Sequence, residues 1–548
     1  MKPLRAAGLY ALLTVVLTWP MATRLHIMDA GDSAFFAWEM AWEVHALTTS
    51  PARLTHAPIF HPLPHTLGYD EPIFGTTLLT LPLWIFTGDA VFVMNVTRLL
   101  TFLLSGLAAY LLARELGCSE GASLLAGAAF AFSPIRTDQI AHLSTQGTQW
   151  LPLTVLFLFR FFRTGLVRDA LLAALFFTLS AYACGYHGLI GLAVLPPAAL
   201  VLLWGRWDRI RAGMLAAAAA AAALVPLYLL HRAALRPLGY VRGVGETQFY
   251  SAALESFLAT GPWNRLYAEV TSPFRTTHAN NLFPGLVVPA LAVVAAVVLW
   301  RRRERPSREA WALLALGLAT VLVALGPDVT LFGRTLMTGP FGLLREMVPA
   351  FQMIRVPSRA GAFLALALVM LAAKAATTLR LRGVALVLVS ALALAETLIV
   401  PIPTPAWADV VDTRLAPPPV YAWLAEQPGD PVVVELPVQD INGIFERPAY
   451  HESIYLVRQT RHWKPLANGY AGIEPAPYVD LREKARRFPS PECLAAFRER
   501  GVRYVVLHRE GYGPNKWARI ERELPAAAGA LAEVARFGGD VVFELRAP

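Results

Sequence analysis

Charged residues are scarce in this sequence. They account for 16% of its 548 residues, whereas about a quarter of the residues in soluble domains are charged. Hydrophobic residues make up 56%, and the mean hydropathy is +0.47. Several uninterrupted apolar runs reach about 17–20 residues, long enough to cross a bilayer core. The composition excludes an ordinary soluble domain and indicates a polytopic α-helical membrane protein.

Cysteine is also rare. The three cysteines, Cys118, Cys184 and Cys493, are odd in number and widely spaced, so no disulfide framework or thiolate metal site is predicted. The sequence also lacks an internal repeat and the paired broken helices that are typical of transporters.

The net charge of +9 comes without a nucleic-acid-binding motif. The arginines instead cluster in short connectors between apolar runs, which is the pattern of cytoplasmic loops. These connectors are "RTGLVR" (Arg163–Arg168), "RWDRIR" (Arg206–Arg211), "RRRERPSR" (Arg301–Arg308) and "RLR" (Arg380–Arg382). We therefore expect no nucleic-acid partner and a cytoplasmic N-terminus.

The apolar runs predict eleven spanning helices. The first could also be read as a cleaved signal peptide, but its apolar run is long and no clear A-x-A site follows, which favours an uncleaved helix. The predicted spans are residues 6–22, 90–113, 119–135, 148–162, 170–184, 188–205, 212–230, 282–300, 309–326, 358–379 and 384–401.

The first outer loop, residues 23–89, is long and holds two further helical stretches. Residues 33–48 mix Phe and Trp with Glu and His, which predicts a helix lying flat at the membrane surface. Residues 73–86 are short and carry Pro82; counting them as a span would place the Arg-rich connectors outside. We read them as a juxtamembrane or re-entrant helix packed on protein.

The composition changes after residue 401. Pro-rich stretches lead into "PVVVELP", "VRYVVLH" and "DVVFELR", which predict short strands, and into "PECLAAFRERG", which predicts a helix with a glycine stop. The sequence thus predicts a membrane domain over residues 1–401 and a soluble α/β domain over residues 402–548, outside the membrane.

Ionisable residues near membrane depth are candidates for function, because burying them without partners costs free energy. The candidates in the outer loops are Asp29, Asp32, Asp70, Glu71, Arg136, Asp138, His142, Glu246, Arg355 and Arg359.

Simpler roles remain open for several of these residues. Asp32 could cap the helix that starts at Ser33, and Asp70 and Glu71 could open the helix that follows Pro72. Asp138 could pair with Arg136 alone.

Arg355 and Arg359 could anchor a helix start. His61 and His65 have the i, i+4 spacing of a ligand pair, but "HPLPH" is a Pro-rich loop and not a helix, so we predict no metal site there.

The order of these loops resembles the GT-C class of membrane glycosyltransferases. Asp32 follows the first span and begins an interfacial helix, residues 73–86 complete the first outer loop, and "AGAAFAFSPIRTDQ" leads into a second outer loop. Bacterial oligosaccharyltransferases, protein O-mannosyltransferases and the aminoarabinose transferase of lipid A share that plan. The stretches "IFHPLPHTLGYDEPIFG" and "IRVPSRAG" are similar to a large set of bacterial membrane proteins in this superfamily.

The resemblance implies an inverting transferase that uses a sugar linked through phosphate to a polyprenol. The acceptor would be a glycan, lipid or protein of the cell envelope, at the outer face of the bacterial inner membrane. Asp32 would be the general base, in a partly desolvated position that raises its pKa, with Asp70 and Asp138 as second choices. Arg136, Arg355, Arg359 and His142 would hold the donor phosphate.

Asp29, Glu71 and Glu246 would contact substrate. The second loop carries one acid, Asp138, where oligosaccharyltransferases have an acidic pair, and the tail has no WWD-like motif. We therefore expect no cofactor. The single acid argues against a divalent metal, and the missing motif argues against a protein acceptor, but both stay open. Two other classes stay open, namely a transporter or flippase of a lipid-linked saccharide and a non-enzymatic membrane assembly factor.

Overall fold

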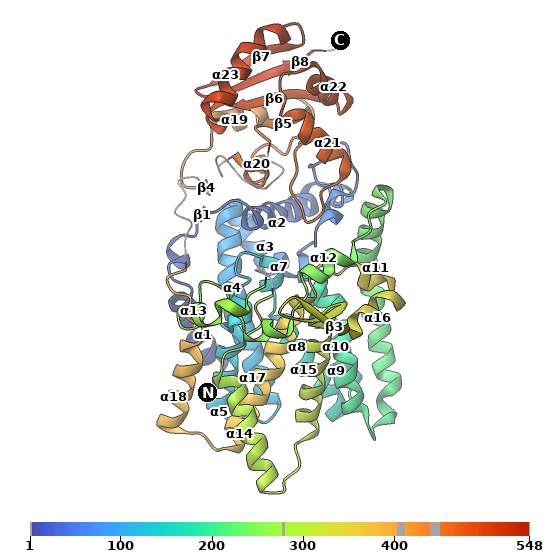
Figure 1. Cartoon of the computed structure of the whole chain (residues 1–548), viewed down its shortest axis with the longest axis vertical. Coiled ribbons are helices and arrows are strands. Elements are labelled where there is room, and N and C mark those ends of the chain that lie inside the picture. Colours follow the sequence, from blue (N-terminus) through green and yellow to red (C-terminus); the bar gives the residue numbers. More distant parts are fainter. Residues whose placement is uncertain (1–2, 277–279, 403–410, 439–449, 547–548) are drawn as a thin grey trace.

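The computed structural model describes residues 3–276, 280–402, 411–438 and 450–546. The molecule is elongated, with a bundle of helices at one end and a sheet with its own helices at the other (Figure 1). The helix α2 (Asp32–Thr49) lies across the boundary between them.

A helix occupies each of the eleven stretches that the sequence predicts as spans. These helices are α1 (Pro3–Leu17), α4 (Ala90–Glu115), α5 (Glu120–Ala131), α8 (Trp150–Thr164), α9 (Val167–Ala183), α10 (Gly185–Leu203), α11 (Ile210–Leu235), α14 (Val287–Arg301), α15 (Arg308–Ala324), α17 (Gly361–Thr378) and α18 (Gly383–Ala395).

Local signals explain where some of these helices begin and end. The Asp89 carboxylate accepts hydrogen bonds from the Val91 and Phe92 amides and so caps α4. Gly165 ends α8 in a left-handed conformation that a β-carbon disfavours.

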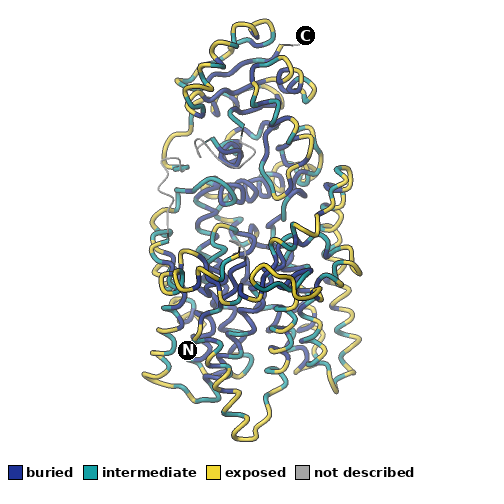
Figure 2. Tube along the Cα trace, in the orientation of Figure 1, coloured by how far each residue is buried: buried dark blue, intermediate teal, exposed yellow. Residues whose placement is uncertain are grey.

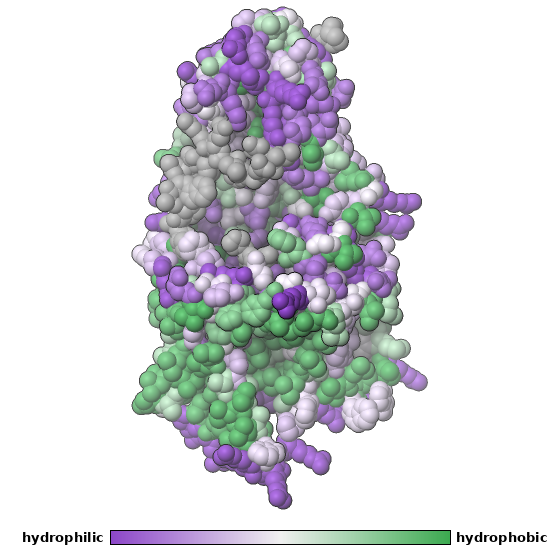
Figure 3. Space-filling model, viewed as in Figure 1, coloured by the Kyte–Doolittle hydropathy of each residue, from purple (hydrophilic) through white to green (hydrophobic). Residues whose placement is uncertain are grey.

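Four segments of the described chain are long and apolar enough to cross a membrane on their own: Ala90–Glu115, Gly185–Leu203, Trp207–Leu238 and Pro357–Thr378. On the face shown in Figure 3, a broad hydrophobic band surrounds the bundle, with hydrophilic surface above it and at its lower tip. The chain is a membrane protein, and the count of eleven spans stays a prediction.

The outer loops add short elements at the upper end of the bundle. They are α3 (Phe74–Thr87), α6 (Pro134–Thr137), α7 (Leu143–Gln146), α12 (Val244–Phe249), α13 (Ala268–Thr271), a hairpin of β2 (Asp328–Leu331) and β3 (Arg334–Thr338), α16 (Pro340–Met347) and the 3-10 turn η9 (Pro357–Ala360).

The helix α2 is covered by protein, and the prediction that residues 33–48 lie flat at the membrane surface stays a prediction. Every residue from Ser33 to Val44 is buried (Figure 2). The reason is that α20 (Glu452–Gln459) of the C-terminal part covers α2, and the Trp38 indole donates to Gln459 Oε1 over 2.9 Å. The aromatic residues of α2 therefore contact protein and not lipid.

The C-terminal part contains a four-stranded sheet with the order β5-β6-β8-β7. β5 and β6 are parallel, and the other neighbours are antiparallel. The strands are β5 (Val432–Leu436), β6 (Val502–His508), β7 (Leu531–Phe537) and β8 (Asp540–Leu545), and the remaining helices are α19 (Pro419–Glu426), α21 (Ala476–Ala485), α22 (Pro491–Glu499) and α23 (Pro514–Glu523). The three predicted strands and the predicted helix α22 are confirmed.

One hydrophobic core joins the first outer loop to the C-terminal part. Buried side chains from Met28 to Met94 and from Val420 to Leu545 belong to the same cluster. The sequence boundary at residue 401 marks a change of composition, but the packing crosses it, and the predicted division into two domains stays a prediction.

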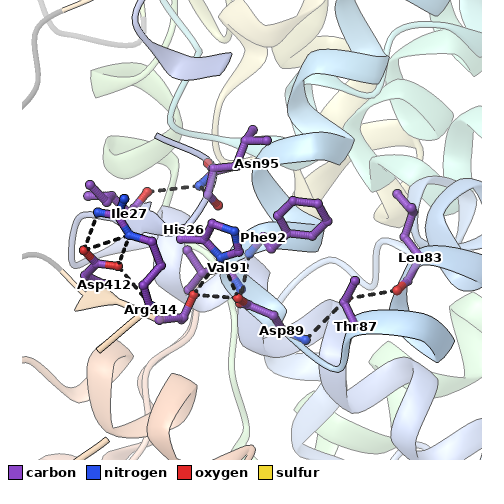
Figure 4. A network of polar contacts seen from close by, with 12 residues as sticks. His26, Ile27, Leu83, Thr87, Asp89, Val91, Phe92, Asn95, Asp412 and Arg414 are labelled. Atoms are coloured by element: carbon purple, nitrogen blue, oxygen red, sulfur yellow. Dashed lines mark hydrogen bonds and ion pairs between the residues drawn. The ribbon is translucent and has the colours of Figure 1, made fainter. Parts of the chain in front are cut away.

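A polar network also fixes the start of the C-terminal part (Figure 4). β1 (Ile27–Met28) pairs with β4 (Val411–Asp412), and His26 Nδ1 lies 2.9 Å from Asp89 Oδ2. The Thr413 hydroxyl donates to the same oxygen over 2.6 Å. The cap of α4 therefore also holds the chain that leads into the sheet.

Candidate functional site

Asp32, at the start of α2, lies where the second outer loop meets the C-terminal part. Its Oδ2 is 2.8 Å from His142 Nε2, and its Oδ1 accepts a hydrogen bond of 2.7 Å from the Tyr470 hydroxyl. Asp32 does not cap α2, because Gly31 occupies the N-cap position without a side-chain bond. About 38% of the Asp32 side chain is exposed, so a substrate can approach it.

The expected increase in the pKa of Asp32 is wrong. Burial does act to raise this pKa, but the hydrogen bonds from His142 and Tyr470 and the charge of Arg359 outweigh it. The pKa of Asp32 therefore lies below its usual range, and the carboxylate stays ionised at physiological pH.

Glu71 and Arg359 form an ion pair beside this carboxylate. Arg359 Nη1 lies 3.0 Å from Glu71 Oε1, and both side chains are largely buried. The Tyr186 amide and the Cys184 thiol approach Glu71 Oε2 within 3.3 Å. The Arg359 guanidinium also lies over the Tyr186 ring, 4.4 Å from its centroid.

A second cationic cluster surrounds Glu246. Its Oε1 is 2.8 Å from Arg355 Nε and 3.0 Å from Arg242 Nη1. Arg355 also donates to the Tyr250 hydroxyl over 3.1 Å. The charges of Arg242 and Arg355 act on the Tyr186 hydroxyl, as the charge of Arg359 does. The cluster around Glu246 and the Glu71–Arg359 pair are therefore neighbours.

The sequence did not single out Arg242 or Tyr470. Arg242 stands four residues before Glu246, just ahead of α12 (Val244–Phe249), and the two side chains form an ion pair; a basic residue this close to an acid in the sequence is a signal that could have identified it. Tyr470 lies 438 residues from Asp32 and carried no such signal.

Asp70 is held by backbone amides. Its Oδ1 accepts from the Glu71 amide and its Oδ2 from the Gly472 amide, both over 2.7 Å. Burial, reinforced by the charge of Glu71, raises its pKa to about 6. Neither Asp70 nor Glu71 caps α3, which begins at Phe74 with Ile73 as its N-cap.

Arg136 is buried under the site. Its guanidinium donates to the Thr148 hydroxyl and to the carbonyl oxygens of Ala131 and Gln146, and it lies 4.4 Å from the centroid of the Phe102 ring. A phosphate-binding role for Arg136 stays a prediction, and these contacts give its nitrogens partners inside the protein.

A cavity of about 30 Å³ adjoins Arg136 and Arg359, a volume that holds one or two water molecules. His187 also lines it; its side chain is 1% exposed, and its Nδ1 has no hydrogen-bond partner among the described residues. The Asp138 carboxylate, beside this region, accepts a hydrogen bond of 2.9 Å from Asn281, which also lines the cavity. Arginine, histidine and asparagine side chains therefore line this cavity together with apolar ones.

The charge of Asp29 acts on the buried guanidinium of Arg98 on α4. Arg98 Nη2 donates to the Ser33 hydroxyl over 2.9 Å. Asp29 thus helps to balance a buried arginine, and its predicted contact with substrate is untested.

The described residues contain no group of three or more His, Cys, Asp or Glu arranged to hold a metal ion. The rings of His56 and His65 are 4.3 Å apart, and both Nδ1 atoms lie 3.1 Å from the Thr55 hydroxyl. The expectation of no resident metal or cofactor stays an expectation.

The whole chain shares its fold with solved structures of membrane transferases. The fold is that of the GT-C membrane glycosyltransferases. The chain superposes on the arabinofuranosyltransferase AftD from Mycobacteria with a TM-score of 0.59 and 17% identity, over 100% of this chain and 40% of that chain. It superposes on an oligosaccharyltransferase from Archaeoglobus fulgidus with a TM-score of 0.52 and 13% identity, over 97% and 73% of the two chains.

The family model of a domain of unknown function, DUF6311, matches residues 78–395, more than half of the chain. The chain belongs to this family. Among curated proteins, no sequence matches it. The chain spans less than half the length of the mycobacterial protein, and at these identities the likeness shows a shared fold.

Proposed function

We propose that the protein is a glycosyltransferase that moves a sugar from a polyprenyl-phosphate donor to a cell-envelope acceptor, at the outer face of the bacterial inner membrane. The observation that carries this proposal is one geometry: the half-buried Asp32 carboxylate, bound by His142, lies at one site with two arginines that are each paired with a glutamate, Arg359 with Glu71 and Arg355 with Glu246. The charge of Arg359 acts on Asp32. In this proposal the N-terminus is cytoplasmic and the C-terminal part lies outside.

The reaction breaks the bond between the anomeric carbon and the phosphate oxygen. The acceptor hydroxyl attacks that carbon from the opposite face, its proton passes to a carboxylate, and the electron pair of the broken bond leaves with the polyprenyl phosphate. A base near the acceptor accelerates such a step about 10²–10⁴-fold. Cations beside the leaving phosphate stabilise the charge that develops there.

Asp32 is our first assignment for the base, because it is exposed and ionised. Asp70 is the second, because its pKa of about 6 makes it the stronger base, although backbone amides bind both of its oxygens. Arg355 and Arg359 would bind the phosphate bidentately, with Arg242 beside them. His142 would hold Asp32 in place, and Glu71 and Glu246 would orient the arginines.

The test is donor consumption by purified protein with a set of radiolabelled polyprenyl-phosphate sugars and extracted envelope acceptors. We expect Asp32→Asn and Arg355→Ala to reduce sugar release at least 100-fold. Asp430→Asn and Arg487→Ala, at exposed positions of the C-terminal part, are the matched controls and should keep wild-type activity.

Full activity of Asp32→Asn would move the base to Asp70 or Asp138. Movement of labelled lipid across the bilayer without sugar release would replace the proposal by a flippase. A wild-type protein that neither consumes nor moves any of the donors would contradict a transferase for this set of sugars.

A further inference from the structure

A segment of the C-terminal part, residues 466–473, passes between the sheet and the first outer loop. We call this segment the strap. It is the only part of the described chain beyond residue 411 for which a hydrogen bond to Asp32 or Asp70 is recorded. The strap contacts β5, the first outer loop and the two acids.

On the side of the sheet, the strap is bound to β5. The Ala467 amide donates to the Val433 carbonyl over 2.8 Å. The Asn468 side chain accepts from the Glu435 amide over 2.7 Å and donates to the Glu435 carbonyl over 2.9 Å. The strap therefore lies beside β5 and is hydrogen-bonded to it at Ala467 and Asn468.

On the side of the first outer loop, the strap makes three further backbone bonds. The Leu466 amide donates to Pro58 O, the His61 amide to Leu466 O, and the Phe60 amide to Asn468 O, each over 2.9 Å. Gly469 lies so close to the Phe60 ring that a β-carbon there would clash with it. The position of the strap is therefore set from both sides.

From this fixed segment, Tyr470 reaches the candidate base. Its hydroxyl donates to Asp32 Oδ1 over 2.7 Å, while His142 occupies Oδ2. The Tyr470 ring lies 5.8 Å from Phe35, one turn along α2, and 5.0 Å from His451. We expect these contacts to keep the aromatic ring of residue 470 in place in Tyr470→Phe as well.

Two residues further on, the Gly472 amide donates to Asp70 Oδ2 over 2.7 Å. The strap thus binds Asp32 and Asp70, the first and second assignments for the base. Besides His142 and Tyr470, the charged or titratable groups that face Asp32 are Arg359, Asp70 and His451.

We infer that the strap is a positioning element of the site, in which Tyr470 fixes the orientation of the Asp32 carboxylate and stabilises its ionised form. The inference rests on the proposed function for its catalytic meaning. It gives the C-terminal part a role inside the reaction centre, because this part supplies a hydroxyl and an amide to the two acids.

The first experiment needs no donor. A small diazo amide esterifies carboxyl groups in their protonated form, and peptide mass spectrometry measures the rate at Asp32 in the full-length protein. Removing a hydrogen bond to a carboxylate raises its pKa by about one unit. At a fixed pH near 5, we expect Tyr470→Phe to increase the rate of Asp32 esterification about tenfold.

Tyr478→Phe is the matched control. It also removes a buried tyrosine hydroxyl from a carboxylate, here Glu452, but it is not in the strap, and Asp32 should react as in the wild type. If Tyr470→Phe does not fold, Asn468→Ser loosens the strap from β5 without touching Asp32, and the same increase is expected. An unchanged rate in both strap variants would overturn the inference.

The second experiment uses the donor. Tyr470 donates to Asp32, and the described residues show no contact between Tyr470 and Arg242, Arg355 or Arg359. Tyr470→Phe should therefore lower kcat about tenfold and leave KM for the donor unchanged. The acidic limb of the kcat profile should move up by about one pH unit. If Tyr470→Phe speeds esterification of Asp32 but the wild type releases no sugar, the positioning role stands and the transferase is contradicted. If Tyr470→Phe raises KM and leaves kcat unchanged, only the positioning role is contradicted.

Discussion

At the scale of single residues, position in the sequence identified the acid but not its environment. Asp32 could be predicted because it follows the first apolar run. Its pKa could not, because the two groups that lower it, His142 and Tyr470, are 110 and 438 residues away along the chain. The environment of Arg136 could not be predicted either. Its loop sequence is polar, but the side chain lies buried and its nitrogens bind protein oxygens.

A buried acid pair in α2 leads to a prediction about pH. Glu39 and Glu43 are fully buried, and the Glu43 carboxylate is bound by the Ile73 amide and the Thr77 hydroxyl. Burial raises the pKa of both groups above the usual 4.5. Their contribution to stability is therefore fully present below about pH 4.5 and is lost as the pH rises through the raised pKa values.

We expect the thermal midpoint of the wild type in detergent to fall more steeply between pH 5 and 8 than that of Glu43→Gln. Glutamine resembles the protonated acid in shape and carries no proton to lose. The difference between the two curves isolates the effect of Glu43. Acids with a lowered pKa, such as Asp32, increase the stability of the protein as the pH rises, and they do so equally in both proteins. Parallel curves would show that Glu43 does not titrate in this range.

At the scale of elements, helices and strands were predicted well where periodicity or apolar length decided them. The predicted and observed starts of α2 and α3 differ by one residue each. Their surroundings could not be predicted, because an aromatic, mixed helix has the same composition whether it covers a membrane surface or fills a protein core. The partner that decides this for α2, α20, is about 400 residues away.

The contact between α3 and α9 is close enough to test. A β-carbon at Gly75 would clash with the Leu179 carbonyl and lie 2.7 Å from the Ala183 amide. Since both are backbone atoms of α9, Gly75→Ala must displace one helix, and we expect a loss of about 1–3 kcal/mol of stability.

Thermal melting in detergent measures this loss as a lower midpoint. Gly8→Ala in α1 is the control, because nothing lies within 4 Å of the added carbon and alanine favours a helix. A midpoint for Gly75→Ala at or above that of Gly8→Ala would show that α3 is not packed as described.

At the scale of the whole molecule, the orientation that the Arg-rich connectors predict can be measured. Cys118, Cys184 and Cys493 are all buried, so a maleimide that cannot cross membranes gives little background. In intact spheroplasts we expect Glu521→Cys, in α23, to react and Arg302→Cys, between α14 and α15, to react only after lysis. The opposite pattern would place the site at the cytoplasmic face and exclude an acceptor outside the cell.

The shared core has a consequence for how the protein is made. The first outer loop is synthesised early, but the side chains that complete its core, from Val420 to Leu545, are synthesised long after it. At about 5–20 residues per second, α20 is synthesised tens of seconds after α2, so the Trp38 indole is without its Gln459 partner during that time. The shared core can therefore form only after the C-terminal part has been synthesised, and a product that ends before Val420 would lack it.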